Sequence, residues 1–286
     1  MRVMTWNVWW RFGPWRERYE AILATLRETR PDAVGLQEVW TRGGENLAGR
    51  LARELGMHWA WVAWNVPGPW RERLGDPEVG VCNAVLSRWP ITDRAAAPLP
   101  PAGGDDERVA LYALLDAPGR PVPFFTTHLT SAAHASALRC RQVAALAEFV
   151  AAHRGGSNFP PVVTGDFNAT PDSDEIRLLG GSRTAPAVEG QVLPDAWEYA
   201  DPAAPAATRD AANPYVAATF RPSARVDYIR VGPPGPGGIG RVTNVRRAGD
   251  GPVGGVWPSD HAAVVADLAL EPAPEPVRVP APKPAS

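Results

Sequence analysis

Short apolar runs, typical of buried strands, alternate with longer amphipathic stretches along the chain from residue 3 to residue 270. Residues 16–29 repeat apolar side chains at helical spacing, whereas residues 33–39 form an apolar run of strand length. Residues 91–129 show three further strand patterns, separated by Pro and Gly turns. This alternation predicts an α/β fold in which two sheets pack face to face with helices outside.

Length and composition limit the possible domain organisation. With 286 residues, the chain can form a substantial core, and we expect one domain over residues 1–270. Residues 271–286 are rich in Pro, Ala and Val, which predicts a disordered tail. The formal net charge of -2 provides no overall basic field for wrapping nucleic acid. It does not exclude an enzyme with a local basic cleft.

Cysteine content and hydropathy predict a reduced, cytoplasmic setting. The two cysteines, Cys82 and Cys140, are too few for a disulfide framework or a cysteine metal site. We find neither a secretory signal core nor an 18-residue apolar run, so we expect no transmembrane segment. Nothing in the sequence indicates an obligate protein partner.

The segment Gly165-Asp166-Phe167-Asn168 follows the apolar run Pro161-Val162-Val163. This pattern predicts a buried strand that carries an acid and an amide at its carboxyl end, where open α/β sheets bind their ligands. Asp and Asn beside Gly are also ordinary turn residues, so the segment alone leaves both interpretations open.

Other polar residues occupy corresponding positions at the ends of apolar strands. The full set is Asn7, Glu38, His128, Asp166, Asn168, Asp227, Asp260 and His261. Carboxylate and amide oxygens without cysteine suit a hard cation, so we expect Mg²⁺ or Mn²⁺ as cofactor. Two histidines beside such oxygens suit proton transfer near neutral pH. The set therefore indicates a metal-dependent catalytic site.

Around these residues the chain resembles the endonuclease/exonuclease/phosphatase superfamily, which includes deoxyribonuclease I, abasic-site endonucleases and neutral sphingomyelinases. Seven segments match in the family's order: Thr5-Trp6-Asn7-Val8, Leu36-Gln37-Glu38-Val39, Asn83-Ala84-Val85-Leu86-Ser87, Thr127-His128-Leu129, Gly165-Asp166-Phe167-Asn168, Arg225-Val226-Asp227-Tyr228-Ile229 and Ser259-Asp260-His261. The resemblance implies a four-layer α/β sandwich of two mixed sheets flanked by helices, with the site at one edge of the sheets.

The resemblance also implies roles for the residues that carry oxygen ligands. Glu38 corresponds to the principal metal carboxylate, assisted by Asn7 and Asp260. Asp166 and Asn168 correspond to the pair that positions the attacking water and the scissile phosphate. A phosphodiester needs an in-line nucleophile and a cation for its developing charge, which agrees with these roles.

By the same resemblance, His261 is the base or the imidazole that contacts phosphate, and Asp227 orients its ring. His128 corresponds to a second histidine, acting as a general acid or a phosphate ligand. In deoxyribonuclease-like relatives a carboxylate supports this second histidine, whereas here Asn83 is the candidate. Cys82, which precedes Asn83, stands where many relatives have Gly.

The predicted activity is that of a divalent-metal-dependent phosphodiesterase, with a nucleic acid or a small or lipid phosphodiester as substrate. A hydrolase of small-molecule or lipid phosphoesters is the alternative, and a noncatalytic binding module on the same fold is a further one. Residues 67–78, rich in Pro, Gly and charge, predict a loop that forms a lid, a substrate wall or a solvated insertion.

Overall fold

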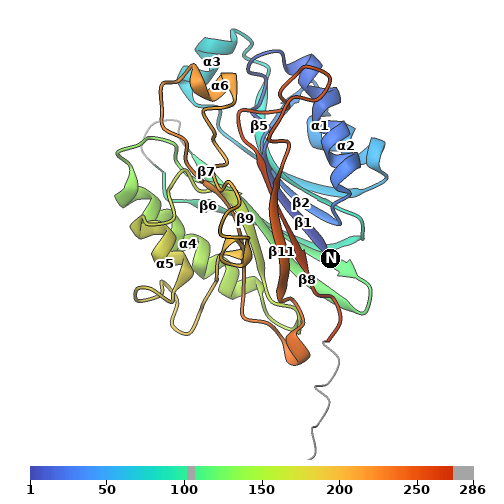
Figure 1. Ribbon diagram of the computed structural model, residues 1–286, viewed down its shortest axis with the longest axis vertical. Coiled ribbons are helices and arrows are strands. Elements are labelled where there is room, and N and C mark those ends of the chain that lie inside the picture. The colour runs from blue at the N-terminus through green and yellow to red at the C-terminus, as the bar shows by residue number, and fades with distance from the viewer. Residues whose placement is uncertain (102–106, 273–286) are drawn as a thin grey trace, which may run out of the picture.

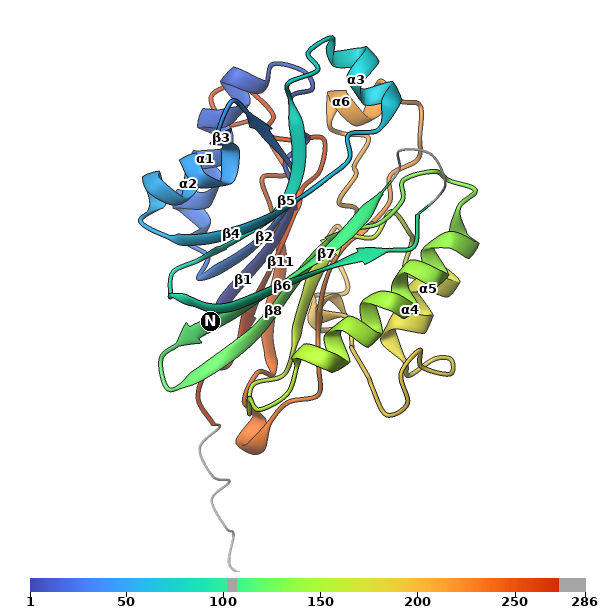
Figure 2. The same cartoon turned by 180° about the vertical axis from the view of Figure 1, so that it is seen from behind.

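Two β-sheets lie face to face at the centre of the protein, and helices cover their outer faces (Figure 1). The computed structural model describes residues 1–101 and 107–272. The view from behind shows helices α1 and α2 on one side of the sheets and α4 and α5 on the other (Figure 2). These four layers confirm the predicted α/β sandwich. Residues 273–286 of the predicted tail lie outside the described part of the chain.

The first sheet has seven strands in the order β11-β12-β1-β2-β5-β4, with β3 paired to β2. The strands are β1 (Arg2–Asn7), β2 (Ala33–Arg42), β3 (Glu45–Asn46), β4 (His58–Trp64), β5 (Gly80–Ser87), β11 (Val242–Ala248) and β12 (Ala263–Leu268). Strands β1 and β2 are parallel, whereas β12 runs antiparallel to β1. The end of β1, a central strand, therefore lies beside the segment that leads into β12.

The second sheet has five strands in the order β10-β9-β8-β7-β6. The strands are β6 (Ile91–Leu99), β7 (Arg108–Ala117), β8 (Arg120–His128), β9 (Val162–Asp166) and β10 (Asp227–Val231). Strands β8 and β9 are parallel and β10 is antiparallel to β9. The carboxyl ends of β8 and β9 and the start of β10 consequently meet at one edge of the sheet.

Helices flank both sheets and fill the loops near the site edge. They are α1 (Trp15–Thr29), α2 (Leu47–Leu55), α3 (Gly68–Leu74), α4 (Ser136–His153), α5 (Asp174–Gly180) and α6 (Pro214–Ala217), with short 3-10 turns η1 (Ala196–Tyr199) and η2 (Pro236–Gly238). One apolar core lies between the sheets, a second under α1 and α2, and a third under α4 and α5. Burial of apolar surface in all three cores stabilises the layered arrangement.

Helix α3 differs from the sequence-based expectation of a loop over residues 67–78. It begins after Pro67 and ends at Gly75, whose φ of 69° allows the left-handed cap. The Pro, Gly and charged residues that predicted a loop occupy its ends and its exposed surface. Trp70 points inward and packs against Trp10, which anchors this short helix to the core under α1 and α2.

The two sheets approach each other closely beside the site. A Cβ atom at Gly35 would overlap the hydroxyl of Thr164 on the opposite sheet, so only glycine fits this position without a shift. Next to it, the Gln37 Nε2 amide donates a hydrogen bond of 2.9 Å to Thr126 Oγ1 across the sheets. This buried polar contact joins the two sheets where their functional strands end.

Candidate active site

Three neighbouring strands of the second sheet carry polar residues at paired positions, side by side across the sheet. Asp166 at the end of β9 is in register with His128 on β8 and with Asp227 on β10. All three side chains are buried. The first sheet adds Asn7 from the end of β1 and Glu38 from β2, so both sheets contribute to one site.

Glu38 reaches the site because β2 contains a β-bulge. The register with β5 shifts between Leu36 and Val39, so that Gln37 and Glu38 together face Asn83. Glu38 has a φ of 55°, in the left-handed region that non-glycine residues rarely adopt. Such backbone strain persists where the surroundings fix it, and here it aims a carboxylate at the opposite sheet.

Asn7 bridges the carboxylates of the two sheets. Its Nδ2 amide donates to Glu38 Oε1 at 2.8 Å and to Asp166 Oδ2 at 3.0 Å. Its Oδ1 accepts a hydrogen bond from the Trp9 backbone at 2.9 Å. In this arrangement Asn7 positions the two carboxylates, and binding a metal through its oxygen would require the amide to turn over.

The carboxylates of the site lack enough compensating positive charge. Burial raises the pKa of Glu38 to about 8, and the nearby Asp260 and Asp166 add to the effect. Burial and the charge of Asp227 raise the pKa of Asp166 to about 6. Burial also raises the pKa of Asp260. Glu38 Oε2 is buried and has no hydrogen-bond partner among the described residues.

His261 forms a buried pair with Asp227. Its Nδ1 lies 2.8 Å from Asp227 Oδ2, and its Nε2 lies 3.8 Å from Asp166 Oδ2. Burial lowers the pKa of His261, but the charges of Asp227, Asp260 and Asp166 outweigh burial and raise it to about 10. The ring is therefore an imidazolium whose Nε2 proton points toward the carboxylate cluster.

His128 carries the opposite charge state. Burial, together with the charges of Arg108 and His261, lowers its pKa well below the usual value, so the ring is neutral. The Asn168 Nδ2 amide donates to Leu129 O at 3.0 Å and lies 3.0 Å from His128 Nε2. His128 Nε2 also lies 3.4 Å from Asp166 Oδ2, whereas Nδ1 is buried and has no hydrogen-bond partner among the described residues. Asn168 itself has a φ of 49°.

The turn that carries Asp260 is tied to the end of β1. Ser259 donates a hydrogen bond of 2.7 Å to Asn7 O and accepts one of 3.1 Å from the His261 backbone. The indole of Trp6 donates to His261 O at 2.8 Å. These contacts fix the Asp260 and His261 backbone against the first sheet.

Asn83 makes no hydrogen bond with His128 in this structure. Its Nδ2 amide donates to Val109 O at 3.0 Å, a carbonyl that also accepts from Thr127 Oγ1. Asn83 thus connects β5 to β7 opposite the bulge that carries Glu38. The sequence pattern indicated that Asn83 lies near the site, but it did not identify the carbonyl of Val109 as its hydrogen-bond partner.

The polar residues open into a cavity of about 380 Å³. Its floor includes Glu38, His128, Asp166, Asn168, Asp260 and His261. Its walls add two kinds of side chain, aromatic and cationic. The aromatic ones are Trp9, Phe12 and Trp70, and the cationic ones are Arg73, Arg209 and Arg221. Helix α3 contributes Trp70 and Arg73, so the 67–78 segment forms a wall of the cavity.

Arg18 is a further residue of the site region that sequence reasoning missed. Its buried guanidinium donates to the carbonyls of Val8, Trp9, Trp10 and Phe12, and also to that of Pro258. It therefore holds the loop after Asn7 to the segment before Asp260. Its position on the amphipathic helix α1 gave no sign of this role. The other two arginines of this helix, Arg16 and Arg27, are exposed.

The donor set fits a divalent cation. Ligand atoms of Glu38, His128 and Asp166 lie within 4.8 Å of one another, as do those of Asp166, Asp227 and His261. The unpaired Glu38 Oε2 and the raised carboxylate pKa values are what hard oxygen ligands show without their cation. The geometry can thus hold a metal ion beside an imidazolium.

Fold and site together are those of metal-dependent phosphoester hydrolases. Residues 4–261 match the Endonuclease/Exonuclease/phosphatase family. The chain belongs to this family, whose members are phosphoester hydrolases that use divalent metals. No curated protein matches the chain.

Solved structures resemble the protein over nearly its whole length. An endonuclease/exonuclease/phosphatase from Beutenbergia cavernae has a TM-score of 0.70 and 24% identity, covering 94% of this chain and 71% of that one. The human Nocturnin catalytic domain with bound sulfate has a TM-score of 0.64 and 20% identity, covering 95% and 94%. Mannosyl-6-phosphatase from Bacteroides thetaiotaomicron has a TM-score of 0.66 and 18% identity, covering 94% and 99%. Identities of this size support the fold alone.

Membrane-spanning helices are absent from the described residues. Within 1–101 and 107–272, every helix is too short or too polar to cross a bilayer.

Proposed function

We propose that this protein is a phosphodiesterase that uses Mg²⁺ or Mn²⁺ and activates water for in-line attack on phosphorus. The observation that carries the proposal is the buried, unpaired Glu38 Oε2, which lies beside two further carboxylates and an imidazolium. A buried carboxylate costs free energy unless a proton or a cation compensates it. Glu38, assisted by Asp260 and by Asn7 once its amide has turned over, would hold the metal, which would supply positive charge to the phosphate oxygens.

In this proposal Asp166 and Asn168 set the geometry of attack. Asp166 accepts hydrogen bonds from Asn7 and from the Asn168 backbone, which fix its carboxylate at the centre of the site. Its pKa of about 6 suits a group that takes a proton from water near neutral pH. Asn168 lines the cavity beside it, and the neutral His128 holds the amide of Asn168 in place.

His261 is assigned the phosphate-contacting role rather than that of base. Asp227 holds the ring through Nδ1, and the surrounding carboxylates keep it protonated. A protonated imidazole cannot accept the proton of water, whereas its Nε2–H can donate to a phosphate oxygen. This fixed donor stabilises negative charge that develops on phosphorus-bound oxygen.

The side chains that line the cavity wall support a phosphodiester substrate. Arg73, Arg209 and Arg221 supply positive charge for phosphate oxygens, and Trp9 and Trp70 offer aromatic surfaces to an organic substituent. The volume of about 380 Å³ suits a nucleotide-sized or smaller group. The substrates that fit are therefore nucleic-acid ends and small phosphodiesters.

Hydrolysis of lipid phosphoesters is the second candidate, and Phe220 favours it. This side chain is 97% exposed and has a φ of 57°. Its neighbours Thr219 and Arg221 both line the cavity. An exposed aromatic ring at the rim of a phosphate-binding cavity is suited to an apolar part of the substrate.

Turnover of bis-p-nitrophenyl phosphate, abasic oligonucleotide, plasmid and sphingomyelin, each with Mg²⁺ or Mn²⁺, tests the proposal. We expect hydrolysis of at least one phosphodiester and its loss in Glu38→Gln. Glu148→Gln, which changes an exposed acid on α4, is the matched control and should retain full activity. Failure to hydrolyse any of the phosphodiesters with either metal would overturn the proposal, and faster turnover of sphingomyelin than of the others would establish the lipid candidate.

A further inference from the structure

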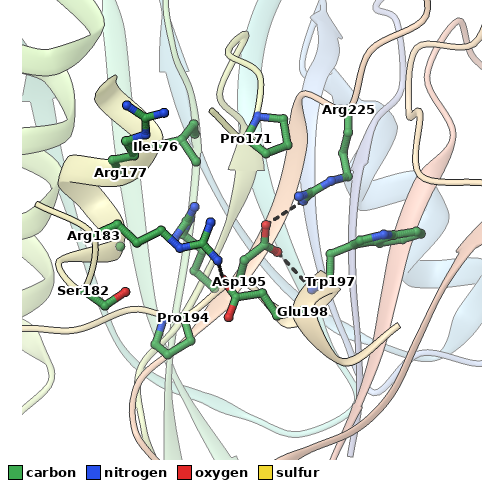
Figure 3. Close-up of a pocket in the computed structure, with 12 residues that line it drawn as sticks. Pro171, Ile176, Arg177, Ser182, Arg183, Pro194, Asp195, Trp197, Glu198 and Arg225 are labelled. Atoms are coloured by element: carbon green, nitrogen blue, oxygen red, sulfur yellow. Dashed lines mark hydrogen bonds and ion pairs between the residues drawn. The ribbon is translucent and has the colours of Figure 1, made fainter. Parts of the chain in front are cut away.

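A second cavity, of about 250 Å³, lies outside the hydrolytic site. It is formed by α5, the segment from Ser182 to Glu198 and the region around β10 (Figure 3). Tyr228 and Arg230 of β10 alternate with Asp227, so they face the helical layer while Asp227 faces the catalytic site. Strand β10 therefore separates this cavity, which we call the arginine pocket, from the hydrolytic site.

The arginine pocket has an excess of positive charge. Four arginines and two acids line it: Arg177, Arg183, Arg225, Arg230, Asp195 and Glu198. Arg225 Nη1 lies 2.7 Å from Asp195 Oδ2, and Arg183 Nη2 lies 3.3 Å from Glu198 Oε1. Figure 3 shows both pairs, with Arg225 pointing toward Asp195 and Arg183 toward Glu198. Arg177 Nη1 lies 3.8 Å from Asp174 Oδ1, an exposed acid outside the cavity lining. Of the four arginines, Arg230 therefore has no acidic partner among the described residues.

Arg230 carries the least compensated charge of this set. It is only 4% exposed, and its hydrogen bond ends on the neutral carbonyl of Leu193 at 2.8 Å. Its Nε has no hydrogen-bond partner among the described residues, and neither does the Nε of Arg225. Both guanidiniums lie against the ring of Tyr228, at 4.6 Å for Arg225 and 5.4 Å for Arg230. Stacking on an aromatic ring offsets only part of the desolvation of a buried cation.

We propose that the arginine pocket is a binding site for a phosphate-type oxyanion, separate from the hydrolytic site. Guanidinium groups match the oxygens of such an anion with paired hydrogen bonds, and a buried site strengthens them. The rim arginines Arg177 and Arg183 are exposed enough to admit the ligand, since their side chains are 46% and 68% exposed. The same chemistry describes a free phosphate ion and a phosphoryl group of a longer ligand.

Calorimetric titration of the full chain with inorganic phosphate in EDTA tests the proposal, with equal ionic strength kept by sodium chloride. The double variant Arg177→Gln/Arg183→Gln should weaken one phosphate-binding event at least tenfold. Glu198→Gln, which removes a rim carboxylate, should strengthen the same event severalfold. The cavity variant Arg73→Gln is expected to leave this event unchanged. Opposite effects of two variants that change only exposed side chains are not expected from a purely structural role of these side chains.

Buried Arg230 provides the second variant, with circular dichroism to confirm that Arg230→Gln folds. The variants Arg177→Gln/Arg183→Gln and Glu198→Gln change exposed side chains, so the proposal can still be tested if Arg230→Gln unfolds. Competition between phosphate and a short oligonucleotide at the pocket would show that it takes backbone phosphoryl groups, and lack of competition that it takes the free ion. Phosphate binding that is insensitive to the rim variants and to Glu198→Gln would overturn the proposal, whatever the catalytic assays show.

Discussion

Glu38→Gln tests the charge state of the site through the pH dependence of stability in EDTA. The folded-state pKa of Glu38 is raised from 4.5 to about 8, so the folded protein keeps a proton that the unfolded chain has lost. Stability is therefore lost as the pH rises above about 4.5, and the loss levels off above about 8. At about 1.4 kcal/mol for each pKa unit, Glu38 accounts for a loss of roughly 3 kcal/mol between pH 5 and pH 8.

Urea denaturation at several pH values measures this effect. The wild-type protein should lose free energy of unfolding between pH 5 and pH 8, and Glu38→Gln should lose roughly 3 kcal/mol less over that range. Comparing slopes removes any constant cost of placing an amide at this position. Glu148→Gln should follow the wild type, because this acid is exposed. The same slope in wild type and Glu38→Gln would refute the account of an uncompensated buried carboxylate.

Three further substitutions test the parts that support the site. Arg18→Met leaves several buried carbonyls without a donor and should lower the free energy of unfolding by roughly 3 kcal/mol or more, measured in urea. Gly35→Ala should be destabilising by about 1–3 kcal/mol, because its Cβ meets Thr164 on the other sheet; a neutral result would contradict the described sheet spacing. Asp227→Asn should lower the pKa of His261, seen by NMR, and reduce turnover roughly 100-fold with metal binding unchanged.

Much of the fold could be predicted because its signals are local. The apolar runs that end in Asn7, His128 and Asp166 became strands, and the polar residues after them meet at one edge. Helix α3 was not predicted, since Pro, Gly and charge dominate its segment and only the packing of Trp70 on the core reveals its role.

The geometry of the site depends on contacts that no local pattern contains. The bulge at Glu38 interrupts a sequence that looks like an ordinary strand, and only the pairing with β5 shows it. The partner of Asn83 is a carbonyl on the other sheet, so its neighbours along the chain gave no indication. The protonation of His261 arises from carboxylates delivered by three separate segments.

Turnover of a phosphodiester with and without metal tests the central proposal most directly. Wild-type protein treated with EDTA should not hydrolyse bis-p-nitrophenyl phosphate, and Mg²⁺ or Mn²⁺ should restore hydrolysis. In Glu38→Gln neither metal should restore it, and calorimetry should show loss of metal binding. Hydrolysis that persists in EDTA, or full activity of Glu38→Gln, would contradict the assignment of Glu38 as the carboxylate that holds the metal.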